Sequence, residues 1–162
     1  MVAVLAHALG VIRRDIFHEP CDVNALATAA LYHDASEILT GDLPTPIKYH
    51  NAEIMSAYHA VEDLAVQKLL GMLPPELRAT YADVLAEDKN GNIYPLVKAA
   101  DKLSAYIKCI EERKAGNNEF LSAEAQTRAA LEGSPLPEVQ YFLEHFIPAF
   151  ERDLDELGAI GQ

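Results

Sequence analysis

The sequence predicts an all-α protein folded as one domain over residues 1–162. Apolar residues recur at three- and four-residue spacing along almost the whole chain, which is the period of helices that turn one face toward a core. Alternating runs rich in valine, isoleucine and threonine, which would indicate strands, are missing from the sequence. Because 50% of the residues are apolar, a chain of this length can bury a core of its own.

The composition favours a soluble cytoplasmic protein. No apolar run is long enough to cross a membrane, and the amino end lacks the basic stretch and cleavage site of an export signal. Cys21 and Cys109 form no CxxC pair, so neither a disulfide framework nor a zinc ribbon is expected. These features predict no membrane partner and a reducing compartment.

The formal net charge of −12 argues against a nucleic-acid polymer as partner, because no basic stripe offsets the repulsion of its phosphates. A small phosphorylated substrate would meet the same repulsion. A bound divalent cation reverses the local charge, so the composition directs attention to metal-ligating residues.

Two helices are expected in the first part of the chain. The first covers roughly residues 2–17 and ends before Pro20, because proline restricts the residue that precedes it. The second begins after an amino-terminal cap at Asp22 or Asn24. It ends at the dipeptide His33-Asp34.

The middle of the chain predicts a stiff loop and two helices. Residues 40–46 cannot continue a helix, because two prolines remove amide donors. A long helix is expected over residues 51–70, and Pro75 opens another helix that runs to about Glu87. The sequence Asn90-Gly91-Asn92 predicts a turn after it.

The last part of the chain begins with the strongest helical pattern, from Tyr94 to Lys114, and Gly116 is its expected stop. Its apolar residues form a seam that places this helix against the core; they are Leu96, Ala100, Leu103, Ile107 and Ile110. Two more helices are expected, over residues 119–131 and 138–157, with a kink at Pro148 in the second.

Imidazole and acidic side chains gather around the end of the second helix. His33-Asp34 places an imidazole beside a carboxylate, and Glu37 follows on the same side of a helical turn. Asp101 interrupts an apolar stretch of the core helix, where a charge needs a partner. The rigid loop 41–46 holds an aspartate, a hydroxyl and free backbone groups close to them in sequence.

Each of these features also has a purely structural interpretation. A histidine at the edge of the core with a capping aspartate accounts for His33-Asp34. Pairing with Lys98 or Lys102 accounts for Asp101, and Glu37 is then an ordinary solvated glutamate. From the residues alone, both interpretations stay open.

A resemblance to one family is carried by residues 31–49 (LYHDASEILTGDLPTPIKY), 96–103 (LVKAADKL) and 115–120 (AGNNEF). These segments are similar to the YfbR-like HD-domain 5′-deoxynucleotidases. The resemblance implies a helical HD-domain bundle and metal-dependent hydrolysis of deoxyribonucleoside 5′-monophosphates to deoxynucleoside and phosphate.

The same resemblance implies a site and a homodimer. One divalent cation (Co, Mn, Zn, Cu or Mg) is held by His33, Asp34 and Asp101, and Glu37 is the catalytic residue that handles the proton. The residues implied to contact the nucleotide are Asp34, Asp42, Leu43, Pro44, Thr45 and Asp101.

The family's first histidine ligand, in a Glu-His-Ser segment, falls just before Met1, and its Arg-Trp pair lies further upstream. His7 cannot take this place, since about nine residues of helix displace a side chain by ~13 Å. We expect Met1 to be an internal residue of a longer protein, and the chain as printed to bind metal weakly and turn over slowly.

Two alternatives are kept beside the deoxynucleotidase. One is another HD-type nucleotide phosphohydrolase, and the other is a non-catalytic helical module that binds nucleotide or dimerises. The remaining histidines have no spacing that ties them to the site and are interpreted as ordinary; they are His18, His50, His59 and His145.

Overall fold

The computed structural model describes residues 1–43, 51–86, 91–153 and 156. These residues form helices and connecting turns without a strand, which confirms the all-α prediction. Contacts within the chain divide it into two compact units, residues 1–30 with 92–162 and residues 31–91. Each unit is described by itself.

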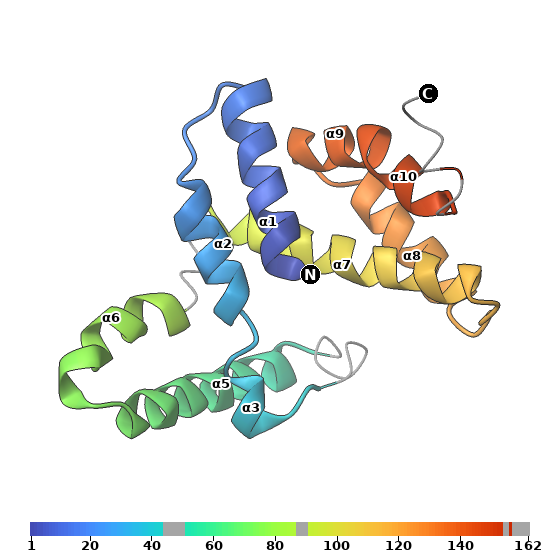
Figure 1. Ribbon diagram of the computed structural model, residues 1–162. Coiled ribbons are helices and arrows are strands. Elements are labelled where there is room, and N and C mark those ends of the chain that lie inside the picture. Colours follow the sequence, from blue (N-terminus) through green and yellow to red (C-terminus); the bar gives the residue numbers. More distant parts are fainter. Residues whose placement is uncertain (44–50, 87–90, 154–155, 157–162) are drawn as a thin grey trace. The chain divides into compact units, whose positions relative to one another are not determined.

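The first unit is built on the long helix α7, against which α1 and α8 pack (Figure 1). Helices α9 and α10 also belong to this unit, as does most of α2. The elements in chain order are α1 (Val2–Val11), η1 (Ile12–Ile16), α2 (Val23–Tyr32), α7 (Tyr94–Lys114), α8 (Leu121–Glu132), α9 (Pro137–His145) and α10 (Ile147–Glu151).

The seam predicted on α7 is the centre of the core. All five of its residues are fully buried, and the same cluster contains Leu9 of α1, Leu131 of α8 and Phe142 of α9. Burial of one such side chain contributes about 1.5–3 kcal/mol. The core therefore fixes α7 in place, and with it the backbone position of Asp101, which follows the buried Ala100.

The end of the first helix is wider than an ordinary helical turn. After α1, the turn η1 is π-helical, and the amide of Phe17 donates to the carbonyl of Ile12 at 3.2 Å. Arg13 in this turn pairs through Nε with Glu138 of α9, whose side chain is 1% exposed. The ion pair of Arg13 and Glu138 holds η1 against α9.

The start of α2 confirms one of the two predicted caps. Oδ1 of Asp22 accepts a hydrogen bond from the amide of Ala25 at 2.9 Å, as an amino-terminal cap does. The helix ends at Tyr32, directly before His33, as the sequence predicts.

The prediction of one kinked helix over residues 138–157 is wrong. Helix α9 ends at His145, Phe146 lies between the two helices with φ of −112° and ψ of −39°, and Pro148 lies in the first turn of the separate helix α10. Proline has no amide hydrogen for the carbonyl four residues earlier, and its ring clashes with that carbonyl. The helix therefore stops and restarts; residues 154, 155 and 157 lie outside the described residues.

The second unit contains α3 (Glu37–Thr40), α5 (Ala52–Met72) and α6 (Pro75–Leu85), with α5 in contact with both others. The last two match the predicted helices closely. Arg78 of α6 donates through Nε and Nη2 to the carbonyls of Leu73 and Gly71, at 3.0 and 3.2 Å. These bonds satisfy carbonyl groups that the end of α5 leaves without helical partners.

No helix in the described ranges is long and apolar enough to cross a membrane. Cys21 and Cys109 are free thiols, as the absence of a disulfide framework in the sequence predicts. Burial raises the pKa of both thiols.

Candidate metal centre

The predicted His-Asp pair lies in the turn that follows α2. Residues 33–36 form this turn, in which the amide of Ala35 donates to the carbonyl of Tyr32 at 2.9 Å. Nε2 of His33 lies 2.9 Å from Oδ2 of Asp34. The local fold thus brings an imidazole nitrogen and a carboxylate oxygen to one point.

An aromatic contact holds the residue before this pair. The rings of Tyr32 and Tyr81 pack edge to face, with centroids 6.2 Å apart and an interplanar angle of 84°. Such a pair adds about 0.5–1.5 kcal/mol to the burial of its rings. Tyr81 of α6 therefore supports the backbone from which His33 projects, a role that the sequence alone does not indicate.

Glu37 opens α3 one turn after Asp34. Its amide donates to the carbonyl of Asp34 at 3.0 Å, so the helical turn predicted between these two residues is present. The backbone of Asp34 and that of Glu37 are therefore fixed relative to each other within one turn.

The segment after α3 is held by its backbone at Gly41. The amide of Gly41 donates to the carbonyl of Glu37 at 2.9 Å. The carbonyl of Gly41 accepts from the hydroxyls of Thr40 and Tyr58, at 3.0 and 3.2 Å. Tyr58 of α5 thus anchors the start of the predicted substrate loop. The sequence does not predict this contact, because nothing distinguishes Tyr58 from other residues of its helix.

We expect Gly41→Ala to destabilise this segment by about 1–3 kcal/mol, because φ of 72° and ψ of 163° fall in a region that only glycine adopts readily. Space does not limit the change, since nothing lies within 4 Å of an added methyl group. Urea unfolding and the KM for nucleotide would measure the effect, and both the free energy of unfolding and the affinity should fall.

Gly71→Ala is the matched control, because Gly71 lies inside α5 and an added methyl group there also meets nothing within 4 Å. Its backbone suits alanine, so this change should raise the free energy of unfolding by roughly 0.5–1 kcal/mol. Equal losses of stability in the two variants would contradict the role assigned to the backbone of Gly41.

The other predicted site residues divide between the two units. Asp42 is exposed and Leu43 partly buried, directly after Gly41 in the second unit. Asp101 belongs to α7 in the first unit. Pro44 and Thr45 lie outside the described residues.

The His33-Asp34 pair fits a divalent cation. First-row ions bind imidazole nitrogen and carboxylate oxygen at about 2.0–2.2 Å, and two donor atoms 2.9 Å apart can both reach one ion at such distances. A mixed nitrogen and oxygen set suits borderline ions. The donor chemistry and the local geometry of the pair therefore agree with a metal ligand role.

Three of the other histidines lie in the described ranges with the following surroundings. His7 lies exposed on the surface of α1. Nδ1 of His59 lies 2.8 Å from a carboxylate oxygen of Glu62, and the ring of His145 packs against Tyr141 with centroids 4.2 Å apart. His50 lies outside the described residues.

The fold is similar to that of an HD-domain phosphohydrolase from Listeria innocua, with a TM-score of 0.78 and 25% sequence identity. The likeness covers 94% of this chain and 74% of that one. An all-helical fold of this kind, with a histidine and an aspartate side by side, defines the HD-domain phosphohydrolase class, whose members depend on a metal.

Within this class, the chain belongs to the 5′-deoxynucleotidase YfbR-like family, which it matches over residues 1–150. The 5′-deoxynucleotidase YfbR of Shigella flexneri serotype 5b is 48% identical over 158 residues, 97% of this chain and 79% of that protein. The 5′-deoxynucleotidase of Erwinia tasmaniensis is 47% identical over 97% of this chain and 80% of that protein. The family predicted from three short segments is confirmed.

Proposed function

We propose that this chain, a 5′-deoxynucleotidase by family, hydrolyses deoxyribonucleoside 5′-monophosphates with a divalent cation held by His33, Asp34 and Asp101. The approach of His33 Nε2 and Asp34 Oδ2 to 2.9 Å carries the proposal. The three residues offer one imidazole nitrogen and two carboxylate oxygens. This set would leave coordination positions for water and a phosphate oxygen.

The bound ion would lower the pKa of a coordinated water and offset the charge of the phosphate. Charge compensation matters here because the chain carries a net charge of −12 and would otherwise repel a phosphate ester. We assign the proton transfer to Glu37, one turn after Asp34. Its carboxylate takes the proton of the attacking water and returns it to the 5′ oxygen as the phosphorus–oxygen bond breaks.

The nucleotide is assigned to the segment that Gly41 begins. Asp42 supplies a carboxylate for a sugar hydroxyl, and the partly buried Leu43 supplies an apolar contact for the deoxyribose. Pro44 and Thr45 continue this segment in the proposal. The bonds of Thr40 and Tyr58 to the Gly41 carbonyl support this assignment, because they fix the backbone where the segment begins.

The test is a combined metal and activity analysis of the full-length protein. We expect one divalent ion per chain, and release of phosphate and thymidine from dTMP when cobalt is supplied. A panel of deoxyribonucleoside and ribonucleoside monophosphates should show faster release from the deoxy compounds. A bound ion with no release of phosphate from any deoxynucleotide would overturn the proposal, as would release that persists unchanged after chelation.

The ion is proposed to be Co, Mn, Zn, Cu or Mg, which metal analysis of protein from its own cells would decide. We also propose that the protein acts as a cytoplasmic homodimer. The free thiols Cys21 and Cys109 support a reducing compartment. Sedimentation at several concentrations tests the dimer.

A further inference from the structure

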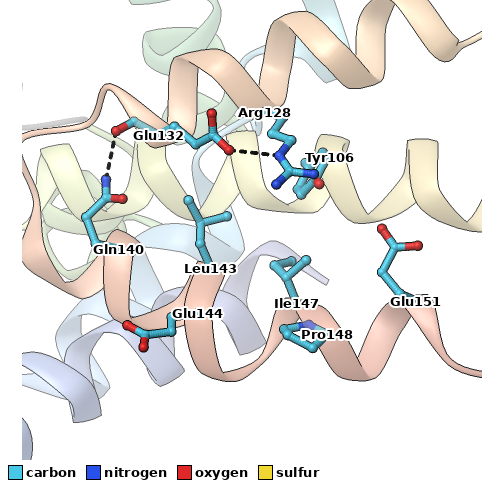
Figure 2. A pocket seen from close by; sticks show the side chains of 9 residues that line it. All are labelled: Tyr106, Arg128, Glu132, Gln140, Leu143, Glu144, Ile147, Pro148 and Glu151. Atoms are coloured by element: carbon cyan, nitrogen blue, oxygen red, sulfur yellow. Dashed lines mark hydrogen bonds and ion pairs between the residues drawn. The ribbon is translucent and has the colours of Figure 1, made fainter.

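Two pockets formed by described residues of the first unit differ in the charge of their walls. Figure 2 shows the larger one, of about 560 Å³, whose walls carry Glu132, Glu144 and Glu151 but only one cation, Arg128. Nε of Arg128 already donates to Glu132 at 2.8 Å. This pocket therefore repels an anion.

The second pocket is a groove of about 440 Å³ between α7 and the turn after α8. No acidic side chain lines it, although the chain as a whole is strongly acidic. Lys98 and Lys102 line it from α7, and Ser134 lines it from the turn. We call it the lysine groove.

The two lysines are fixed to the same face of α7. They lie four residues apart, which places them one above the other on a helix, and the buried seam holds that helix in the core. The ammonium group of Lys98 lies 5.6 Å from the centre of the Tyr94 ring. Lys102 is exposed, whereas Lys98 is partly buried.

Hydrogen bonds hold the turn on the opposite side of the lysine groove. The side-chain amide of Gln140 donates to the carbonyl of Ser134 at 3.2 Å, which fixes the turn. Oγ of Ser134 accepts from the amide of Leu136 at 3.3 Å, so its own hydrogen can be donated elsewhere. Ala99 and the almost fully buried Leu131 give the groove an apolar floor.

Lys102 differs in its surroundings from the cations of this chain that are held in ion pairs. Many of the arginines and lysines in the described ranges have a carboxylate within 4 Å; these are Arg13, Arg14, Lys108, Arg113 and Arg128. Among the described residues, Lys102 makes no such ion pair. Its charge is therefore available to a ligand of opposite sign.

We propose that the lysine groove binds a phosphate group, either inorganic phosphate or a phosphate monoester. Lys102 would pair with the phosphate, the hydroxyl of Ser134 would donate a hydrogen bond to it, and the apolar floor would take an organic part. The volume is in the range of small-molecule sites. Asp101 does not line this groove. The lysine groove is therefore a different site from the metal site proposed for the hydrolysis.

The test follows the amide signals of Ser134 and Leu136 by NMR in full-length protein with EDTA present, while inorganic phosphate is added. We expect saturable shifts that report one site. Lys102→Gln should weaken binding about tenfold, as expected for loss of one charge-assisted contact. Lys68→Gln, the same change at an exposed lysine of α5, should leave the affinity within about twofold.

Separate titrations with dTMP, deoxyribose 5-phosphate and thymidine distinguish the sources of the phosphate. If dTMP binds more tightly than inorganic phosphate, the ligand of the groove is a nucleotide. If the two bind equally, the ligand is free phosphate. Shifts that do not saturate, equal weakening in the two lysine variants, or binding of an acidic peptide instead of phosphate would overturn the proposal. The Asp34→Asn variant should bind phosphate in the lysine groove as tightly as the unaltered protein does. The binding result can therefore be interpreted even if the proposed hydrolysis is wrong.

Discussion

Asp34→Asn should remove the bound metal ion and slow phosphate release from dTMP by on the order of 10³-fold, equivalent to about 4 kcal/mol of transition-state stabilisation. An asparagine amide has nearly the shape of the carboxylate but no charge, so it is a poor ligand for a divalent cation. In the unaltered protein, Oδ2 of Asp34 lies 2.9 Å from Nε2 of His33. In the variant, the imidazole of His33 is the only strong metal ligand left of the pair. Metal content and the rate of phosphate release measure the two effects.

Asp63→Asn is the control, because it makes the same change at an exposed position of α5 and should alter neither quantity. Asp101→Asn should reproduce the losses seen at Asp34. The double variant Asp34→Asn/Asp101→Asn should be no worse than either single one, because both changes remove the same ion. Additive losses, or full metal content in either single variant, would show that these residues do not share a cation.

The periodicity of the sequence predicted the helices well where one face is buried. On α7, the seam of five apolar residues, each fully buried, gave both the bounds of the helix and its place in the core. A cap at Asp22 or Asn24 was predictable for a related reason, because a cap depends only on residues a turn away, and the structure selects Asp22. Such features need no knowledge of distant parts of the chain.

Features that depend on distant parts of the chain were not predictable. Glu138 was not singled out in the sequence, yet it is buried against Arg13. The π-helical turn that carries Arg13 and the helix break at Phe146 were also missed. Periodicity identifies a buried face, but it does not say which partner meets a charge on that face.

The site divides in the same way. His33, Asp34 and Glu37 are neighbours in sequence, so a single turn sets their spacing. This proximity was predicted from the residues, whereas their roles stay a prediction. Asp101 belongs to a helix that is distant in sequence, and only the family resemblance connected it with His33 and Asp34. The supporting tyrosine Tyr58 acts through a hydroxyl that no sequence pattern distinguishes from others.

Glu37→Gln should slow phosphate release by about 10²–10⁴-fold while the metal content stays at one ion per chain. Glutamine keeps the size of the side chain but accepts no proton at neutral pH, so a proton-transfer role would be lost and the metal ligands would remain. The backbone bonds of Glu37 to Asp34 and Gly41 do not involve the side chain, so the fold of α3 should persist. The measurement is kcat for dTMP as a function of pH.

The pH profile separates proton transfer from a structural role, because loss of the proton-handling group removes the limb of the profile that its ionisation produces. Glu53→Gln, at an exposed position of α5, should keep both the rate and the profile of the unaltered protein. A Glu37→Gln variant that is slow but keeps both limbs would mean that Glu37 only positions its neighbours. In that case the proton would have to be handled by another group, and Asp42, the nearest acid after Glu37 in the sequence, would be the next to replace.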